Sequence, residues 1–191
     1  MGRMTTLKNV EIERKFLLDN IPSWIKANSH IRIEQAYLMV SPNKEIRLRK
    51  EGSKRILTIK NGKGLIREEF ETELHKSEFD ELWNSVRKNF SIVKTRYFIF
   101  ENGKTIDVDV FSGPLLGLAV VEVEFNSKKE AEGFKLPYWF GKEVTFEEKY
   151  KDKNLWISIN KTRGVRKNFS VDKSIIDIAL RAFDSNKNPK H

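Results

Sequence analysis

The feature that most constrains the fold of this chain is a set of segments in which every second residue is charged. Glu11-Ile12-Glu13-Arg14-Lys15 and Val121-Glu122-Val123-Glu124-Phe125 are two examples. Successive side chains of a β-strand point to opposite faces, so the charges of one segment share a face. The alternation predicts strands over 9–18, 31–40, 44–50, 54–61, 65–74, 91–101, 104–111 and 118–126.

Short turn signals separate these segments. Asn102-Gly103, between two alternating runs, is typical of a β-hairpin. We therefore expect an α+β protein that is mainly antiparallel β, with an eight-stranded closed β-barrel and peripheral helices. Helices are expected over 21–28, from a capping box at Ser77 to about 88, from Ser127, over 150–160 and over 171–184.

The domain organisation follows from this pattern. Residues 1–160 are expected to form the barrel domain. Residues 161–191 are expected to be a C-terminal extension that carries the helix at 171–184 and ends in a frayed tail. The extension either plugs one end of the barrel or packs on its surface.

The charges of the strands are sorted by sign. A single strand of this kind is ordinary as the solvent face of a sandwich, but acidic pairs at i, i+2 are uncommon on solvated β-surfaces. The sorting favours a charged interior, with the apolar faces turned outward beneath helices. The acidic set is Glu11, Glu13, Glu69, Glu71, Asp107, Asp109, Glu122 and Glu124, and the basic set is Lys15, Arg47, Arg49, Lys60, Lys94 and Arg96.

Composition limits what such an interior could bind. The chain has no cysteine and only three histidines, which excludes a thiolate site and disfavours a zinc site built on imidazole. Clustered carboxylates suit a hard cation such as Mg²⁺ or Mn²⁺. Arginine and lysine suit phosphoryl groups, and the net charge of +9 agrees with an anionic partner. Metal-bound polyphosphate satisfies both sets.

These segments resemble the CYTH superfamily, the triphosphate tunnel metalloenzymes, and within it the bacterial tripolyphosphatase-like subgroup. The resemblance covers roughly residues 8–160. It begins with the Glu11-x-Glu13-x-Lys15 signature and continues in order through Ile46–Arg49, Leu57–Lys60, Arg67–Glu71, Val93–Tyr97, Val108–Phe111, Val121–Phe125 and Trp139–Thr145. After Thr145 the sequence departs from the family's usual short turn, because Phe146–Asn154 is longer and more charged.

The resemblance implies roles for the charged residues. Glu11, Glu13, Glu122 and Glu124 would bind Mg²⁺ or Mn²⁺, and Glu69, Glu71 and Asp109 would act through water or orient the basic residues. All six basic residues would bind phosphates. Lys15, Lys94 and Arg96 would also be catalytic, Lys15 by polarising the phosphoryl group under attack and the other two by offsetting charge on the leaving group. Asp107 is left without a role.

The resemblance also implies an activity, the metal-dependent hydrolysis of a triphosphate. Inorganic tripolyphosphate is the favoured substrate, and a nucleoside triphosphate, thiamine triphosphate and an adenylyl cyclase reaction are the alternatives on the same scaffold. A non-catalytic module that binds polyphosphate or RNA is the alternative of another class, although acidic pairs would repel a nucleic-acid backbone. The N-terminus lacks an apolar signal core. We therefore expect a cytoplasmic protein without a membrane partner, either a monomer or a homodimer.

Overall fold

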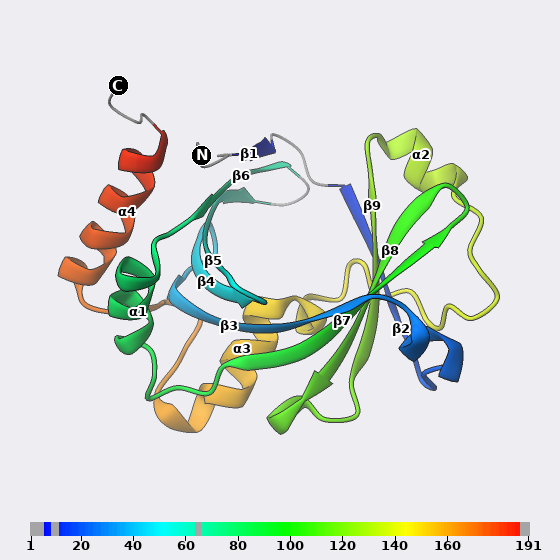
Figure 1. Ribbon diagram of the computed structural model, residues 1–191, viewed down its shortest axis with the longest axis horizontal. Helices are drawn as coiled ribbons and strands as arrows, with labels where there is room; N and C mark the ends of the chain where they lie inside the picture. Colours follow the sequence, from blue (N-terminus) through cyan, green and yellow to red (C-terminus); the bar gives the residue numbers. More distant parts are fainter. Residues whose placement is uncertain (1–5, 9–11, 64–65, 188–191) are drawn as a thin grey trace.

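The chain folds around one curled antiparallel β-sheet with helices on its outside (Figure 1). This computed structural model describes residues 6–8, 12–63 and 66–187. The strands are β1 (Thr6–Lys8), β2 (Ile12–Leu17), β3 (His30–Val40), β4 (Lys44–Glu51), β5 (Lys54–Lys63), β6 (Ile66–Glu73), β7 (Ile92–Glu101), β8 (Lys104–Ser112), β9 (Ala119–Phe125) and β10 (Phe169–Ser170). The α-helices are α1 (Lys76–Asn84), α2 (Lys128–Gly133), α3 (Asp152–Asn160) and α4 (Lys173–Lys187), and the 3₁₀ turns are η1 (Ser23–Ala27), η2 (Gly113–Leu115), η3 (Glu148–Tyr150) and η4 (Lys161–Arg163).

The sheet order is β1-β6-β5-β4-β3-β7-β8-β9-β2, and β10 pairs with β3. The eight longer strands, β2 to β9, correspond to the eight segments predicted from the alternation. The predicted hairpin is also present: β7 and β8 pair from Val93–Ser112 to Glu101–Lys104, and Asn102 at its tip has a φ of 52°. Asparagine tolerates this left-handed conformation better than most residues, which explains its place in the turn.

The curled sheet forms a half-barrel, and the outer edge of β2 pairs with a later segment. Leu17 N–H donates to Lys142 O at 2.8 Å, and Val144 N–H donates to Lys15 O at 2.8 Å. The predicted closed barrel would need the two edges of the sheet to meet. Within the described residues, the part of β2 from Lys15 to Leu17 is hydrogen-bonded to β9 on one side and to segment 141–144 on the other.

The apolar faces of the strands point outward, as the charge pattern predicted. Ile46 and Leu48 of β4 are fully buried beneath α1 and α4, next to Phe79 and Ala179. Val121 and Val123 of β9 are buried in a second cluster with Phe16 and Trp139. Burial of these surfaces supplies the main driving force for folding. The concave face is thereby left to the charged residues.

The helices pack on the outer face of the sheet and at one of its ends. α4 packs against α1 and the outer face of the sheet, so it is a surface helix and not a plug. α3 lies at the end of the sheet marked by Tyr37 and Val40 of β3, where its Leu155 and Trp156 join the same apolar cluster. Among the described residues, no helix is both long and apolar enough to cross a bilayer.

Two helix starts test the predicted capping boxes. At Ser127 the predicted hydroxyl cap is present, because the hydroxyl accepts a hydrogen bond from Glu130 N–H at 3.1 Å, whereas the Glu130 carboxylate accepts from Asn126 N–H at 2.8 Å. The box at Ser77 is wrong by two residues: α1 begins at Lys76, and the Glu78 carboxylate accepts from His75 N–H at 3.0 Å. The carboxylate at the third position of each helix accepts a backbone hydrogen bond, from His75 N–H at α1 and from Asn126 N–H at α2.

Candidate functional site

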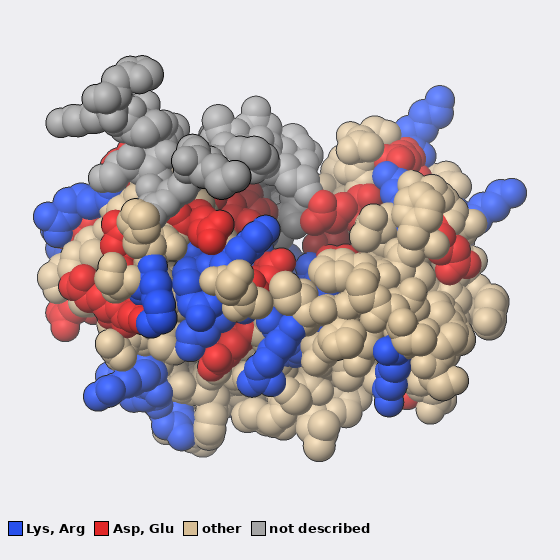
Figure 2. All heavy atoms as spheres, viewed as in Figure 1, with Lys and Arg blue, Asp and Glu red and all other residues tan. Residues whose placement is uncertain are grey.

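The concave face of the sheet encloses a cavity of about 640 Å³. Acidic and basic side chains lie next to each other around a hollow near the middle of one face (Figure 2). The cavity brings together residues from the eight strands β2 to β9, from the segment before α3 and from the first turn of α3. The predicted residues that line it are Glu13, Lys15, Arg47, Arg49, Lys60, Glu69, Glu71, Lys94, Arg96, Asp107, Glu122 and Glu124. Glu11 lies outside the described residues.

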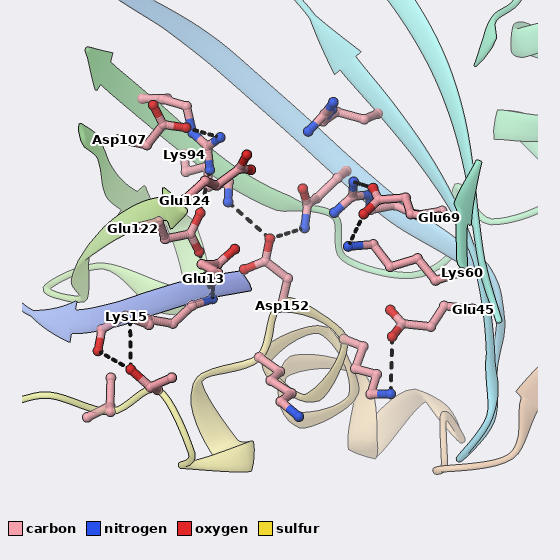
Figure 3. A pocket seen from close by; sticks show the side chains of 18 of the residues that line it. Glu13, Lys15, Glu45, Lys60, Glu69, Lys94, Asp107, Glu122, Glu124 and Asp152 are labelled. Atoms are coloured by element: carbon pink, nitrogen blue, oxygen red, sulfur yellow. Dashed lines mark hydrogen bonds and ion pairs between the residues drawn. The ribbon is translucent and has the colours of Figure 1, made fainter. Parts of the chain in front are cut away.

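One side of the cavity is built by β2 and β9, which pair so that their charges face each other. Glu13 is opposite Glu124, and Lys15 is opposite Glu122. The Lys15 ammonium lies 2.6 Å from Glu122 Oε1 and 3.4 Å from Glu13 Oε1. In Figure 3 these carboxylates and Asp107 lie on the same side of the pocket. The predicted metal-binding residues that the structure describes are therefore neighbours.

Behind this side lies a buried ion network centred on Asp109. Arg96 makes a bidentate contact with Asp109, with Nε–Oδ1 and Nη2–Oδ2 distances of 2.7 Å. Lys94 Nζ lies 2.6 Å from Asp109 Oδ2, and Asp109 is fully buried. Arg96 also contacts Glu122 Oε2 at 2.7 Å and Asp107 Oδ2 at 2.5 Å. Asp109 thus contacts both basic residues, and its role in orienting them stays a prediction.

The opposite side of the cavity is built by β4, β5 and β6, which contribute the basic residues Arg47, Arg49 and Lys60 and the acidic residues Glu45, Glu51, Glu69 and Glu71. Lys60 Nζ lies 2.9 Å from Glu69 Oε2, and Arg49 Nη2 lies 3.1 Å from Glu71 Oε2. Arg47 reaches Thr58 Oγ1 at 3.3 Å, but its buried Nε has no hydrogen-bond partner in the described part of the chain. A buried guanidinium donor without a partner is costly. An anion in the cavity would satisfy it.

A residue that the sequence pattern did not select, Asp152, also enters the cavity. It is the first residue of α3. Its Oδ2 lies 3.0 Å from Lys94 Nζ and accepts a hydrogen bond from Gln35 Nε2 at 2.8 Å. Figure 3 shows Asp152 projecting from the start of the helix into the space between the two sides. The only sequence signal for it was its position in the charged stretch after Thr145 that departs from the family.

Burial and neighbouring charges shift the pKa values of the acidic residues in the cavity, some upward and some downward. Burial alone would raise the pKa of Glu122, but Lys15, Lys94 and Arg96 outweigh it and lower that pKa to about 2. For Asp107, burial and the neighbouring carboxylates outweigh Arg96 and raise the pKa to about 6. Lys94, Lys15 and Arg47 likewise outweigh burial and hold the pKa of Asp152 well below its usual range. Glu122 and Asp152 are therefore ionised at neutral pH.

The basic residues remain charged in spite of their burial. Burial would lower the pKa of Lys15, but Glu122 and Glu13 raise it well above the ordinary value. Lys94 follows the same pattern, because Asp109 and Asp152 outweigh burial. For Arg49 the balance is reversed, since burial and the neighbouring Arg47 lower its pKa. An anion would relieve this repulsion.

The donor set suits an oxygen-ligated cation, although the described carboxylates do not converge on one point. Glu13, Glu122 and Glu124 share a face of adjacent strands and offer only oxygen, which Mg²⁺ and Mn²⁺ prefer. Among the described residues, no three acidic or histidine side chains are grouped closely enough to hold an ion as they stand. In chemical type the residues fit such a metal, and Glu122 is now engaged by Lys15 and Arg96.

Comparison with known proteins connects this cavity with a family. The CYTH domain family matches residues 9–153. An inorganic triphosphatase of Nitrosomonas europaea is 39% identical over 152 residues, which are 78% of this chain and 98% of that protein. An inorganic triphosphatase of Acetivibrio thermocellus is 32% identical over 146 residues, 76% of this chain and 92% of that protein.

A solved structure gives the same result in three dimensions. The crystal structure of an inorganic triphosphatase superimposes on this chain with a TM-score of 0.58 at 36% sequence identity. The superposition covers 78% of this chain and 99% of that one. The similarity therefore extends over the whole length of the solved relative.

Proposed function

The chain belongs to the CYTH domain family, and from that premise we propose that it is a metal-dependent triphosphatase with inorganic tripolyphosphate as its preferred substrate. Two relatives at 39% and 32% identity are inorganic triphosphatases, and both are covered almost completely by the match. The family alone leaves the substrate open, so the proposal depends on the cavity itself.

The observation that carries the proposal is the pairing of carboxylates with basic side chains on both sides of one cavity. Glu13, Glu122 and Glu124 face the space from β2 and β9, whereas Arg47 and Lys60 face it from β4 and β5. A polyphosphate needs cations along its length, and a cleavable phosphoryl group needs charge stabilisation where the bond breaks. The basic residues and the carboxylates of the cavity supply these requirements together.

We assign the metal to the side of the cavity built by β2 and β9. Glu13, Glu122 and Glu124 would hold Mg²⁺ or Mn²⁺, together with Glu11, which lies outside the described residues. A bound ion of this kind polarises a phosphoryl oxygen and lowers the pKa of a coordinated water. Glu69 and Glu71 are assigned to holding the basic side chains, because they contact Lys60 and Arg49.

The chain's own residues bind and orient the substrate. Arg47, Arg49 and Lys60 bind the phosphates on the side built by β4, β5 and β6. Lys15 lies between two of the proposed metal-binding carboxylates, and we assign it to the phosphoryl group under attack. Lys94 and Arg96, oriented by Asp109, offset charge on the leaving group.

We also propose that the half-barrel encloses the phosphate chain as a tunnel. Its two edge strands, β1 and β2, belong to the same N-terminal segment. Such enclosure would exclude bulk water from the phosphoryl groups and strengthen each ion pair with them.

The test is phosphate release from tripolyphosphate, ATP and thiamine triphosphate, with Mg²⁺, with Mn²⁺ and with EDTA. We expect metal-dependent release that is fastest with tripolyphosphate. Lys15→Met should lower kcat/KM by at least about 100-fold, the usual cost of removing a group that stabilises transition-state charge. Lys128→Gln, at an exposed position on α2, is the matched control and should leave it unchanged. Absence of release from all three compounds would refute the proposal.

A further inference from the structure

The two ends of the cavity differ in what closes them. At one end, Leu155 and Trp156 of α3 pack against Tyr37 and Val40 of β3. At the other end, a second cavity of about 380 Å³ shares Asp107, Glu122 and Glu124 with the first and is also lined by Lys104 and Asn126. By the β2–β9 register, Glu13 and Glu124 lie toward this second cavity, and Leu17 and Val120 lie toward α3. A substrate therefore meets α3 at the inner end of the site.

Each end of the cavity contains carboxylates, but only those at one end are assigned to the metal. The end near β9 has Glu13, Glu124 and Asp107, which belong to the proposed metal side. The end near α3 has Asp152, and the donors on its carboxylate are protein groups, Lys94 and Gln35. The negative charge of Asp152 therefore remains in place when the metal side is filled.

Asp152 is held too firmly to act as a loose lid. Its side chain is 16% exposed and bonds both β7, through Lys94, and β3, through Gln35. The helix behind it is anchored by Trp156, which is fully buried, and by Asn160. The Asn160 side chain accepts from Phe90 N–H at 2.7 Å and donates to Phe90 O at 2.9 Å. The carboxylate is thus a fixed part of the inner end.

The same contact limits what Lys94 can offer to a phosphate. An ammonium group has three hydrogen-bond donors, and Asp109 and Asp152 occupy two of those of Lys94. Lys94 is therefore shared between Asp109 and Asp152, and Asp109 is also bonded by Arg96. The lysines on either side of Asp152 are paired as well, Lys151 with Glu148 and Lys153 with Glu45. A phosphoryl group placed beyond Lys94 would therefore face the carboxylate of Asp152 beside cations that already have acidic partners.

We propose that Asp152 ends the phosphate chain, so that the site accepts three phosphoryl groups and rejects a fourth. This inference rests on the proposed function, because it takes a linear polyphosphate as the ligand. Asp152 is a specificity-determining residue in this view. Like charges about 7 Å apart repel strongly enough at the effective dielectric constant of a protein to change binding by about tenfold or more.

The test compares tripolyphosphate with tetrapolyphosphate in Asp152→Asn and Asp152→Ser. The Asn variant removes the charge and keeps the shape, and the Ser variant removes both. We expect the tetra-to-tri ratio of kcat/KM to rise about tenfold in D152S and by a smaller factor in D152N. Asp177→Asn, which removes a charge from a half-exposed position on α4, is the control and should leave the ratio unchanged.

Binding of both compounds is also measured by calorimetry without metal, so that the ratio is available even if hydrolysis fails. An unchanged ratio in both variants, with melting temperatures close to wild type, would overturn the role of Asp152 and leave the triphosphatase proposal standing. Equal loss of both ligands would show that Asp152 only positions Lys94, and would overturn it too. Absence of hydrolysis by the wild type would instead refute the proposed function, and the binding ratio would still decide the inference.

Discussion

At the scale of single residues, Arg47 is a basic residue of the cavity with an unsatisfied hydrogen-bond donor. Its Nε is buried without a partner in the described part of the chain, and Glu69 Oε1 is 4.0 Å from Nη2. We expect Arg47→Lys to raise KM for tripolyphosphate about tenfold, because lysine replaces a bidentate fork with a point charge. Steady-state kinetics measures this. Arg181→Lys on α4 is the control, and an unchanged KM in R47K would mean that Arg47 does not bind phosphate.

Asp107 makes a pH-dependent prediction about the metal-free protein. Its pKa of about 6 in the folded state exceeds the ordinary aspartate value, so the folded state holds this proton more tightly than the unfolded state. The stabilisation is complete below about pH 4 and is lost as pH rises through about 6. We therefore expect the unfolding free energy of Asp107→Asn, taken relative to that of wild type, to increase by about 1 kcal/mol as pH rises from 4 to 7. Urea unfolding at each pH measures the difference, and a constant difference would contradict the assigned pKa shift.

At the scale of elements, the pairing of β2 with segment 141–144 holds the strand that carries Lys15. A Cβ at Gly141 would lie 2.5 Å from the Leu17 carbonyl oxygen, which is backbone and cannot move aside. We expect Gly141→Ala to cost about 2 kcal/mol of unfolding free energy, as overpacking usually does, and to lower kcat/KM by displacing Lys15.

Gly133→Ala is the matched control for this change. Gly133 ends α2, and a Cβ there meets no atom within 4 Å. The unfolding free energy of the Gly133→Ala variant should stay within about 0.5 kcal/mol of that of wild type. Equal stability of G141A and G133A in urea would mean that the 141–144 pairing does not hold β2.

At the scale of the whole molecule, the net charge of +9 should attract a highly anionic substrate from a distance. Salt screens such attraction, because the Debye length falls from about 10 Å at 0.1 M to about 3 Å at 1 M. We expect kcat/KM for tripolyphosphate to fall about tenfold between 0.05 and 0.5 M NaCl, with kcat nearly constant, since buried pairs are screened less. Stopped assays at fixed metal concentration measure this, and a flat kcat/KM would exclude long-range steering.

The sequence by itself determined the eight longer strands, the charged face of each one and the sign of the charges on that face. These properties follow from the two-residue period of a strand, which is a local rule and needs no knowledge of neighbours. Glu13, Lys15, Glu122 and Glu124 could therefore be placed on a common lining before their strands were known to pair. The family resemblance rests on the same local blocks and is confirmed by the match over 9–153.

Only the tertiary structure decided how the ends and edges of the sheet are completed. The contact between Asp152 and Lys94 joins residues 58 positions apart, and the bond between Leu17 and Lys142 joins β2 to a segment far along the chain. Such contacts depend on where α3 and segment 141–144 pack, which the packing of many apolar side chains determines together and no local period encodes. The charged interior could be predicted because it depends on the local period of the strands. The position of Asp152 at the inner end depends on the packing of α3, so only the folded chain shows it.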